Sequence, residues 1–88
     1  MKYNGHRNWN HWNVSLWLFN TETLYDQMRH EVSISRTLDE AARGILTSMQ
    51  RYREHQEGVS WYYGNATTPD GAPYTFTSVR AALVGWEN

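Results

Sequence analysis

Residues 9–19 read WNHWNVSLWLF and hold three of the five tryptophans of an 88-residue chain. Trp9, Trp12, Leu16 and Phe19 recur at the spacing of one helical face, which predicts a helix that buries this face. Each buried tryptophan ring removes about 150–250 Å² of surface from water. The segment is therefore expected to be the largest single contribution to the stability of the domain.

A strand is the alternative for the same segment, because Val14, Leu16 and Leu18 alternate along it. Trp17 would then lie on the polar face of the strand, which favours the helix. Asn8 stands directly before the segment and is suited to be the N-cap of that helix, accepting a hydrogen bond from a backbone N–H.

A second helix is predicted to begin at Thr21, which can cap it, and to carry Glu22 in its first turn. A negative charge at that place interacts favourably with the helix dipole. The apolar stripe of this helix comprises Leu24, Tyr25, Met28 and Val32. Residues 33–36 interrupt the pattern and are predicted to form the connection to the next helix.

Residues 37–40 read TLDE, a capping box in which Thr37 and Glu40 satisfy each other's backbone N–H groups. It predicts a third helix over about residues 38–56, with Gly58 as its C-terminal stop. The side chains expected on its buried side are Leu38, Ala42, Ile45, Leu46, Met49 and Tyr52.

The last third of the chain changes character. Residues 59–63 and 74–76 are β-prone and aromatic, and turn signals lie between them. A small hairpin joining 59–63 to 73–76 and an ordered aromatic loop are both compatible with this pattern. A short final helix is predicted from residue 77 or 78 to Trp86, with Val79, Leu83 and Trp86 on one face.

These elements predict a mainly α fold. We expect one domain over residues 1–88, with three or four helices and a small β-hairpin near 59–76, and an α+β fold as the alternative. Its aromatic core is expected to come from residues 9–19, 38–52 and 79–86.

Composition excludes several classes of function. The chain has no cysteine, which removes disulfides, thiol catalysis and thiolate metal sites. Its longest apolar run, residues 16–19, is far shorter than the roughly 20 residues of a membrane span. The polar N-terminus does not resemble a signal peptide. We therefore expect a soluble, cytoplasmic protein.

No residue pattern points to catalysis or to a cofactor. His6, His11, His30 and His55 lack the spacing of a helical metal site and are expected to be surface or interfacial imidazoles. No serine stands in a Gly-x-Ser-x-Gly turn, and no glycine-rich phosphate loop follows a strand. We expect no enzyme activity, no bound metal and no cofactor.

Charge is concentrated in one place. The net charge is −1, yet residues 21–40 carry five acids and only two arginines. An anionic face of this kind suits a basic partner protein. The expected partner-binding residues are Glu22, Asp26, Glu31, Asp39 and Glu40, helped by the aromatic side chains of Tyr62 and Tyr63.

A small nucleic-acid-binding accessory protein is the alternative function. Exposed aromatic rings near arginine can stack on unpaired bases, and Trp61, Tyr62, Tyr63 and Tyr74 with Arg80 fit that composition. Basic residues are not clustered along the chain, however, and phosphate contacts supply most of the affinity for nucleic acid. Direct nucleic-acid binding is therefore the less favoured hypothesis.

Two segments resemble small uncharacterised proteins of bacteriophages and prophages. The first is WxxWNVxLW (9–17) with NxE (20–22) and LY (24–25), and the second is TPDG (68–71) with YTFTSVR (74–80). The resemblance implies a phage origin, in the cytoplasm of an infected or lysogenic bacterial host. It also implies a non-enzymatic inhibitor that occupies the surface of a host defence complex, as anti-CRISPR and antirestriction proteins do. The expected partner is then a CRISPR effector, contacted through a local anionic patch.

Overall fold

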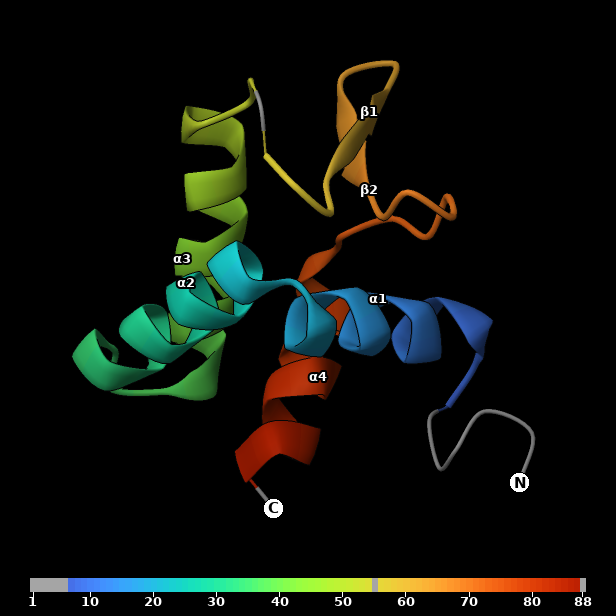
Figure 1. Cartoon of the computed structure of the whole chain (residues 1–88). Coiled ribbons are helices and arrows are strands. Elements are labelled where there is room, and N and C mark those ends of the chain that lie inside the picture. The colour runs from blue at the N-terminus through green and yellow to red at the C-terminus, as the bar shows by residue number, and fades with distance from the viewer. Residues whose placement is uncertain (1–6, 55, 88) are drawn as a thin grey trace.

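The computed structural model describes residues 7–54 and 56–87, which form four helices and one hairpin (Figure 1). In chain order they are α1 (Trp9–Asn20), α2 (Glu22–Ile34), α3 (Leu38–Arg51), β1 (Ser60–Tyr62), β2 (Asn65–Thr67) and α4 (Phe76–Glu87). The prediction of a mainly α fold with a small hairpin is confirmed. His6, His55 and the polar N-terminal segment lie outside the described residues.

Helix α4 is the central element of the packing. It contacts α1 on one side and α3 on the other, while α2 packs against both α1 and α3. The hairpin projects from the end of the molecule where α3 finishes, and α4 runs toward the opposite end (Figure 1). None of the described helices is long and apolar enough to cross a membrane.

The buried face of α1 differs from the prediction. Trp9 and Leu16 are each 38% exposed, whereas Asn13, Val14 and Leu18 are buried. The predicted face of Trp9, Trp12, Leu16 and Phe19 is therefore wrong. Val14 and Leu18 are i and i+4 residues of smaller volume, and they allow α1 to approach its neighbouring helices closely, with the bulkier indole rings at the edge of the contact.

The centre of the core is mainly aliphatic. It contains Val14, Leu18, Leu24, Met28, Ile45, Met49, Val79 and Leu83, together with several alanines. Most aromatic rings that contact it are only partly buried, namely Phe19, Tyr25, Trp61, Phe76 and Trp86. Tyr74 is the exception and is buried. The aromatic rings therefore surround the core more than they fill it.

Helix α2 buries Leu24 and Met28 as predicted, but Thr21 is not a side-chain cap. The Thr21 side chain is buried instead, where its Oγ1 lies 3.0 Å from the position that a Cβ on Gly58 would occupy. Gly58 has φ +80°, a conformation that favours glycine. Thr21 is thus the N-cap residue of α2 through its backbone, whose carbonyl oxygen accepts from the N–H of Tyr25 at 2.8 Å, while its side chain contributes to packing at this close approach.

Helix α3 begins as predicted and ends earlier. Thr37 Oγ1 accepts from the backbone N–H of Glu40 at 3.1 Å, but the Glu40 carboxylate accepts from the N–H of Arg36 and not of Thr37. The helix stops at Arg51 because the Gln56 side chain donates to the carbonyl oxygens of Met49 and Tyr52, which replaces further helical bonds. Tyr52 is consequently 59% exposed, and its predicted burial is wrong.

The hairpin has a different partner strand from the predicted one. Residues 60–62 pair antiparallel with 65–67 in the register Ser60–Thr67, Trp61–Ala66 and Tyr62–Asn65. The two central turn residues, Tyr63 and Gly64, both have positive φ, 49° and 81°, as a two-residue type I′ turn requires. The segment 73–76 joins only through a bridge from Pro73 to Thr67 and a bond from Tyr74 N–H to the Ala66 oxygen.

Helix α4 begins at Phe76, slightly before the predicted start. Thr75 Oγ1 accepts from the N–H of Ser78 at 3.1 Å, and Ser78 Oγ accepts from the N–H of Thr75 at 3.0 Å. This is a reciprocal capping box. Val79 and Leu83 are fully buried as predicted, and Trp86 is partly buried.

Candidate functional site

Two tyrosine rings stand at the tip of the hairpin. Tyr62 is 66% exposed and Tyr63 is 88% exposed, and their ring centroids lie 4.4 Å apart in an edge-to-face arrangement. We call these two side chains, with the turn residue Gly64, the hairpin tip. The hairpin tip presents an aromatic surface that contributes nothing to the core.

Trp61 anchors the hairpin to the segment that follows α3. Its Nε1 donates to the carbonyl oxygen of Arg53 at 3.0 Å, and the Arg53 guanidinium lies 4.4 Å from the centre of its ring. Tyr74 provides a second anchor, since its hydroxyl donates to the Gly58 oxygen at 2.6 Å. Burial raises the pKa of Tyr74, so this donor stays protonated. The hairpin tip is thus held by contacts below it.

The five predicted acidic residues do not form one face. Asp39 makes an ion pair with Arg80 of α4, and Glu40 accepts the Arg36 N–H. Glu31 is half-buried against α3, with its Oε1 2.0 Å from where a Cβ on Gly44 would stand. Glu22 and Asp26 remain exposed, one turn apart on α2.

The hairpin tip and the exposed acids of α2 lie on different parts of the molecule. Figure 1 shows the hairpin projecting at one end and α2 beside the lower part of α3.

The residues of the nucleic-acid hypothesis are also not brought together. Tyr74 is buried, so its ring is not available for stacking on bases. Arg80 pairs with Asp39 between α3 and α4. Of that set, Trp61, Tyr62 and Tyr63 remain neighbours on β1 and its turn, and Arg53 is the cation beside them.

A polar network that sequence reasoning missed joins α1 to the loop after β2. Asp70 Oδ2 accepts from Asn13 Nδ2 at 2.8 Å and from Trp17 Nε1 at 2.9 Å. The hydroxyl of Thr68, itself fully buried, donates to Asn13 Oδ1 and accepts from the N–H of Ala72. We call this set the Asn13–Asp70 network.

The Asn13–Asp70 network links the two segments on which the phage-protein resemblance depends. Asn13 and Trp17 belong to the first motif, and Thr68 and Asp70 belong to the second. In the sequence, the feature that could have indicated this contact was the presence of both motifs, WNVxLW and TPDG, in one chain. These motif residues therefore have a structural role: they attach the loop after β2 to α1.

Acid is expected to weaken the attachment of this loop. The hydrogen bonds from Asn13, and then from Trp17, hold the pKa of Asp70 below its ordinary value of 3.8. The unfolded chain therefore takes up the proton first, so the stabilisation is complete above pH 3.8 and is lost as the pH falls through the lower, folded pKa.

Urea unfolding at about pH 6 and about pH 3 tests this expectation with Asp70→Asn as the comparison. The wild-type chain should exceed the variant in free energy of unfolding by more at the higher pH. A difference that is the same at both pH values would show that the ionised carboxylate of Asp70 contributes nothing.

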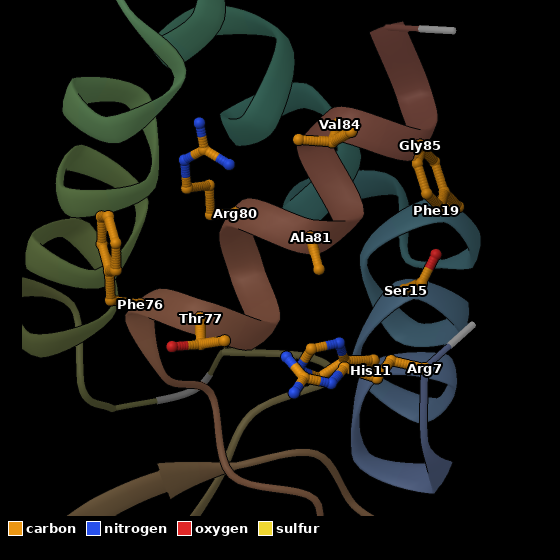
Figure 2. Close-up of a pocket in the computed structure, with 10 residues that line it drawn as sticks. All are labelled: Arg7, His11, Ser15, Phe19, Phe76, Thr77, Arg80, Ala81, Val84 and Gly85. Atoms are coloured by element: carbon orange, nitrogen blue, oxygen red, sulfur yellow. The ribbon is translucent and has the colours of Figure 1, made fainter.

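A groove runs between α1 and α4 and has a volume of about 840 Å³ (Figure 2). We call it the α1–α4 groove. Arg7 and His11 extend into it from the α1 side, and Arg80 stands on the α3 side. Ala81 and Gly85 form part of its wall on α4. The sequence predicted a surface or interfacial imidazole at His11 but not this groove, which exists only because two helices distant in sequence pack together.

Metal binding finds no support in the described part of the chain, where no three histidine, aspartate or glutamate side chains are placed to hold one ion.

Comparison with other proteins identifies the family and not the activity. No curated protein and no solved structure matches the chain. The sequence model of one family matches residues 1–82 of the 88. The chain therefore belongs to DUF7249, a family of unknown function.

Proposed function

We propose that this protein acts without catalysis, by binding a partner protein through the hairpin tip. The observation that carries the proposal is the exposure of two adjacent tyrosine rings, 66% and 88%, on a hairpin anchored from below. Tyrosine is enriched among the residues that dominate protein–protein affinity. Its ring gives a large contact area and loses little conformational entropy on binding.

The backbone of Tyr63 supports a binding role. Its φ of 49° is a left-handed conformation that costs a residue with a side chain about 1–2 kcal/mol and that asparagine or glycine adopts more readily. The Tyr63 ring recovers none of that cost from the core, because it is almost fully exposed. A tyrosine at this place is therefore better explained by an external contact than by folding.

The partner that we propose is a bacterial defence complex such as a CRISPR effector. This choice depends on the resemblance to phage proteins, and on the small size of the domain and its exposed aromatic surface. Glu22 and Asp26 form a second, acidic surface on α2 that can attract a basic partner from a distance. The aromatic contact is then expected to set the dissociation rate and the acidic residues the association rate.

Tyr63→Asn separates binding from stability. Asparagine tolerates positive φ, so the variant should unfold at the same temperature as the wild type or slightly higher. Loss of the ring should weaken capture of the partner from a lysate of the bacterial host by about tenfold or more. Tyr52→Ala is the matched control, since Tyr52 is also exposed but lies at the end of α3.

Three results would contradict the proposal. Capture that is equal for Tyr63→Asn and wild type would exclude the hairpin tip as the main contact. Capture lost only on charge reversal of Glu22 and Asp26 would assign the contact to the acidic surface. Retention of single-stranded DNA or RNA by the purified protein, reduced by Tyr62→Ala, would favour the nucleic-acid hypothesis.

A further inference from the structure

The α1–α4 groove has the size and the mixed lining of a ligand site. Its volume of about 840 Å³ falls within the roughly 300–1,000 Å³ typical of small-molecule pockets. Phe19, Ala81 and Val84 give it apolar walls, while Ser15 and Thr77 add hydroxyl-bearing residues. The groove is separate from the hairpin tip, because it is formed by α1 and α4.

The positive charge of the groove comes from Arg7, because Asp39 offsets the charge of Arg80. Arg7 and His11 reach the groove from the α1 side, and Arg80 lies on the side of α3 (Figure 2). Among the described residues that line the groove there is no aspartate or glutamate. The ion pair of Arg80 with Asp39 uses Nε, which leaves the two terminal nitrogens of the guanidinium outside that contact. An anion is therefore the favoured occupant.

Gly85 lines the groove and has open space beside it. It lies in α4, and a Cβ added there would meet no atom within 4 Å. Packing against the rest of the molecule thus does not require glycine at this position. Alanine would also be the better helix former. With Ala81 one turn earlier, Gly85 leaves space beside Phe19 for a flat group.

We propose that the α1–α4 groove binds a small organic phosphate that carries a ring. The phosphate would lie at Arg7, because the planar guanidinium donates paired hydrogen bonds to phosphate oxygens. The ring would lie along Ala81 and Val84, toward Phe19. This site goes beyond the proposed partner binding and does not depend on it.

Titration with adenosine 5′-monophosphate, followed by backbone amide NMR, tests the site. Saturable shifts at Ala81, Val84 and Gly85 are expected, with a dissociation constant below about 1 mM. Adenosine alone and inorganic phosphate alone should each bind about tenfold more weakly, because each lacks one half of the recognised chemistry.

Two variants and one control locate the site. Arg7→Ala removes the exposed cation, and Gly85→Leu fills the open space beside this residue without touching a cation; each should weaken binding about tenfold. Arg51→Ala, an exposed arginine outside the groove, should leave binding unchanged. The proposal is overturned if no saturable shift occurs, if phosphate or adenosine alone binds as well, or if Arg51→Ala weakens binding as much as Arg7→Ala.

Discussion

Replacement of Asn13 by alanine is expected to lower the free energy of unfolding by about 3 kcal/mol. The Asn13 side chain is buried and makes two hydrogen bonds, one from Thr68 and one to Asp70. Its removal takes the acceptor from the buried Thr68 hydroxyl and leaves a cavity between α1 and the loop. Both losses add to the cost because neither can be compensated by water without disrupting the packing.

Urea unfolding of Asn13→Ala and Asn10→Ala measures this effect. Asn10 is an exposed asparagine of the same helix, so its replacement should change the free energy of unfolding by less than about 0.5 kcal/mol. Equal destabilisation by the two substitutions would mean that Asn13→Ala changes only the local contribution of an asparagine side chain to helix α1. The Asn13–Asp70 network would then not be the attachment of the loop.

Replacement of Gly58 by alanine is expected to cost about 2–4 kcal/mol. Two penalties combine at this position. The positive φ of 80° is unfavourable for alanine, and its Cβ would lie 2.8 Å from Leu24 Cδ1. The same residue presents its carbonyl oxygen to the Tyr74 hydroxyl, so a backbone shift at Gly58 would also disturb the anchor of the hairpin.

Gly71→Ala is the matched control for Gly58→Ala. Gly71 also has positive φ, 98°, but an added Cβ there would meet no atom within 4 Å. Its replacement should carry the conformational penalty alone, about 1–2 kcal/mol. If thermal unfolding shows the same loss for both variants, the close approach of Gly58 to α2 does not contribute to stability.

Local patterns in the sequence predicted the elements well. Helix α1 and its cap at Asn8 follow from residues within a few positions of one another, and the Asn8 side chain does accept the His11 N–H. The Thr37–Glu40 box and the buried Val79 and Leu83 were likewise readable. Such features depend on short-range hydrogen bonds and on helical spacing, which a single sequence contains.

The orientation of α1 could not be predicted in the same way. Apolar residues occur all around this helix, so periodicity does not select one face. The face is selected by Asn13, whose partners Thr68 and Asp70 lie 55 and 57 residues away in the chain. Only the distant loop makes the burial of this polar side chain favourable.

For the candidate sites too, features that are local in the sequence were predictable, and features that depend on contacts between distant residues were not. Tyr62 and Tyr63 were identified from sequence because a pair of tyrosines beside a turn signal is visible in the chain. The acidic residues were also visible, but three of the five, Glu31, Asp39 and Glu40, make contacts within the fold that composition does not reveal. The α1–α4 groove required the packing of two helices more than 50 positions apart.

We propose that a partner protein binds at the hairpin tip and not at the acidic surface of α2. Amide NMR of the isotopically labelled protein, with and without the partner captured from the bacterial host, distinguishes the two surfaces. The largest perturbations are expected at Tyr62, Tyr63 and Gly64, with small changes around Glu22 and Asp26. Perturbations centred on Glu22 and Asp26, with the hairpin tip unchanged, would contradict it.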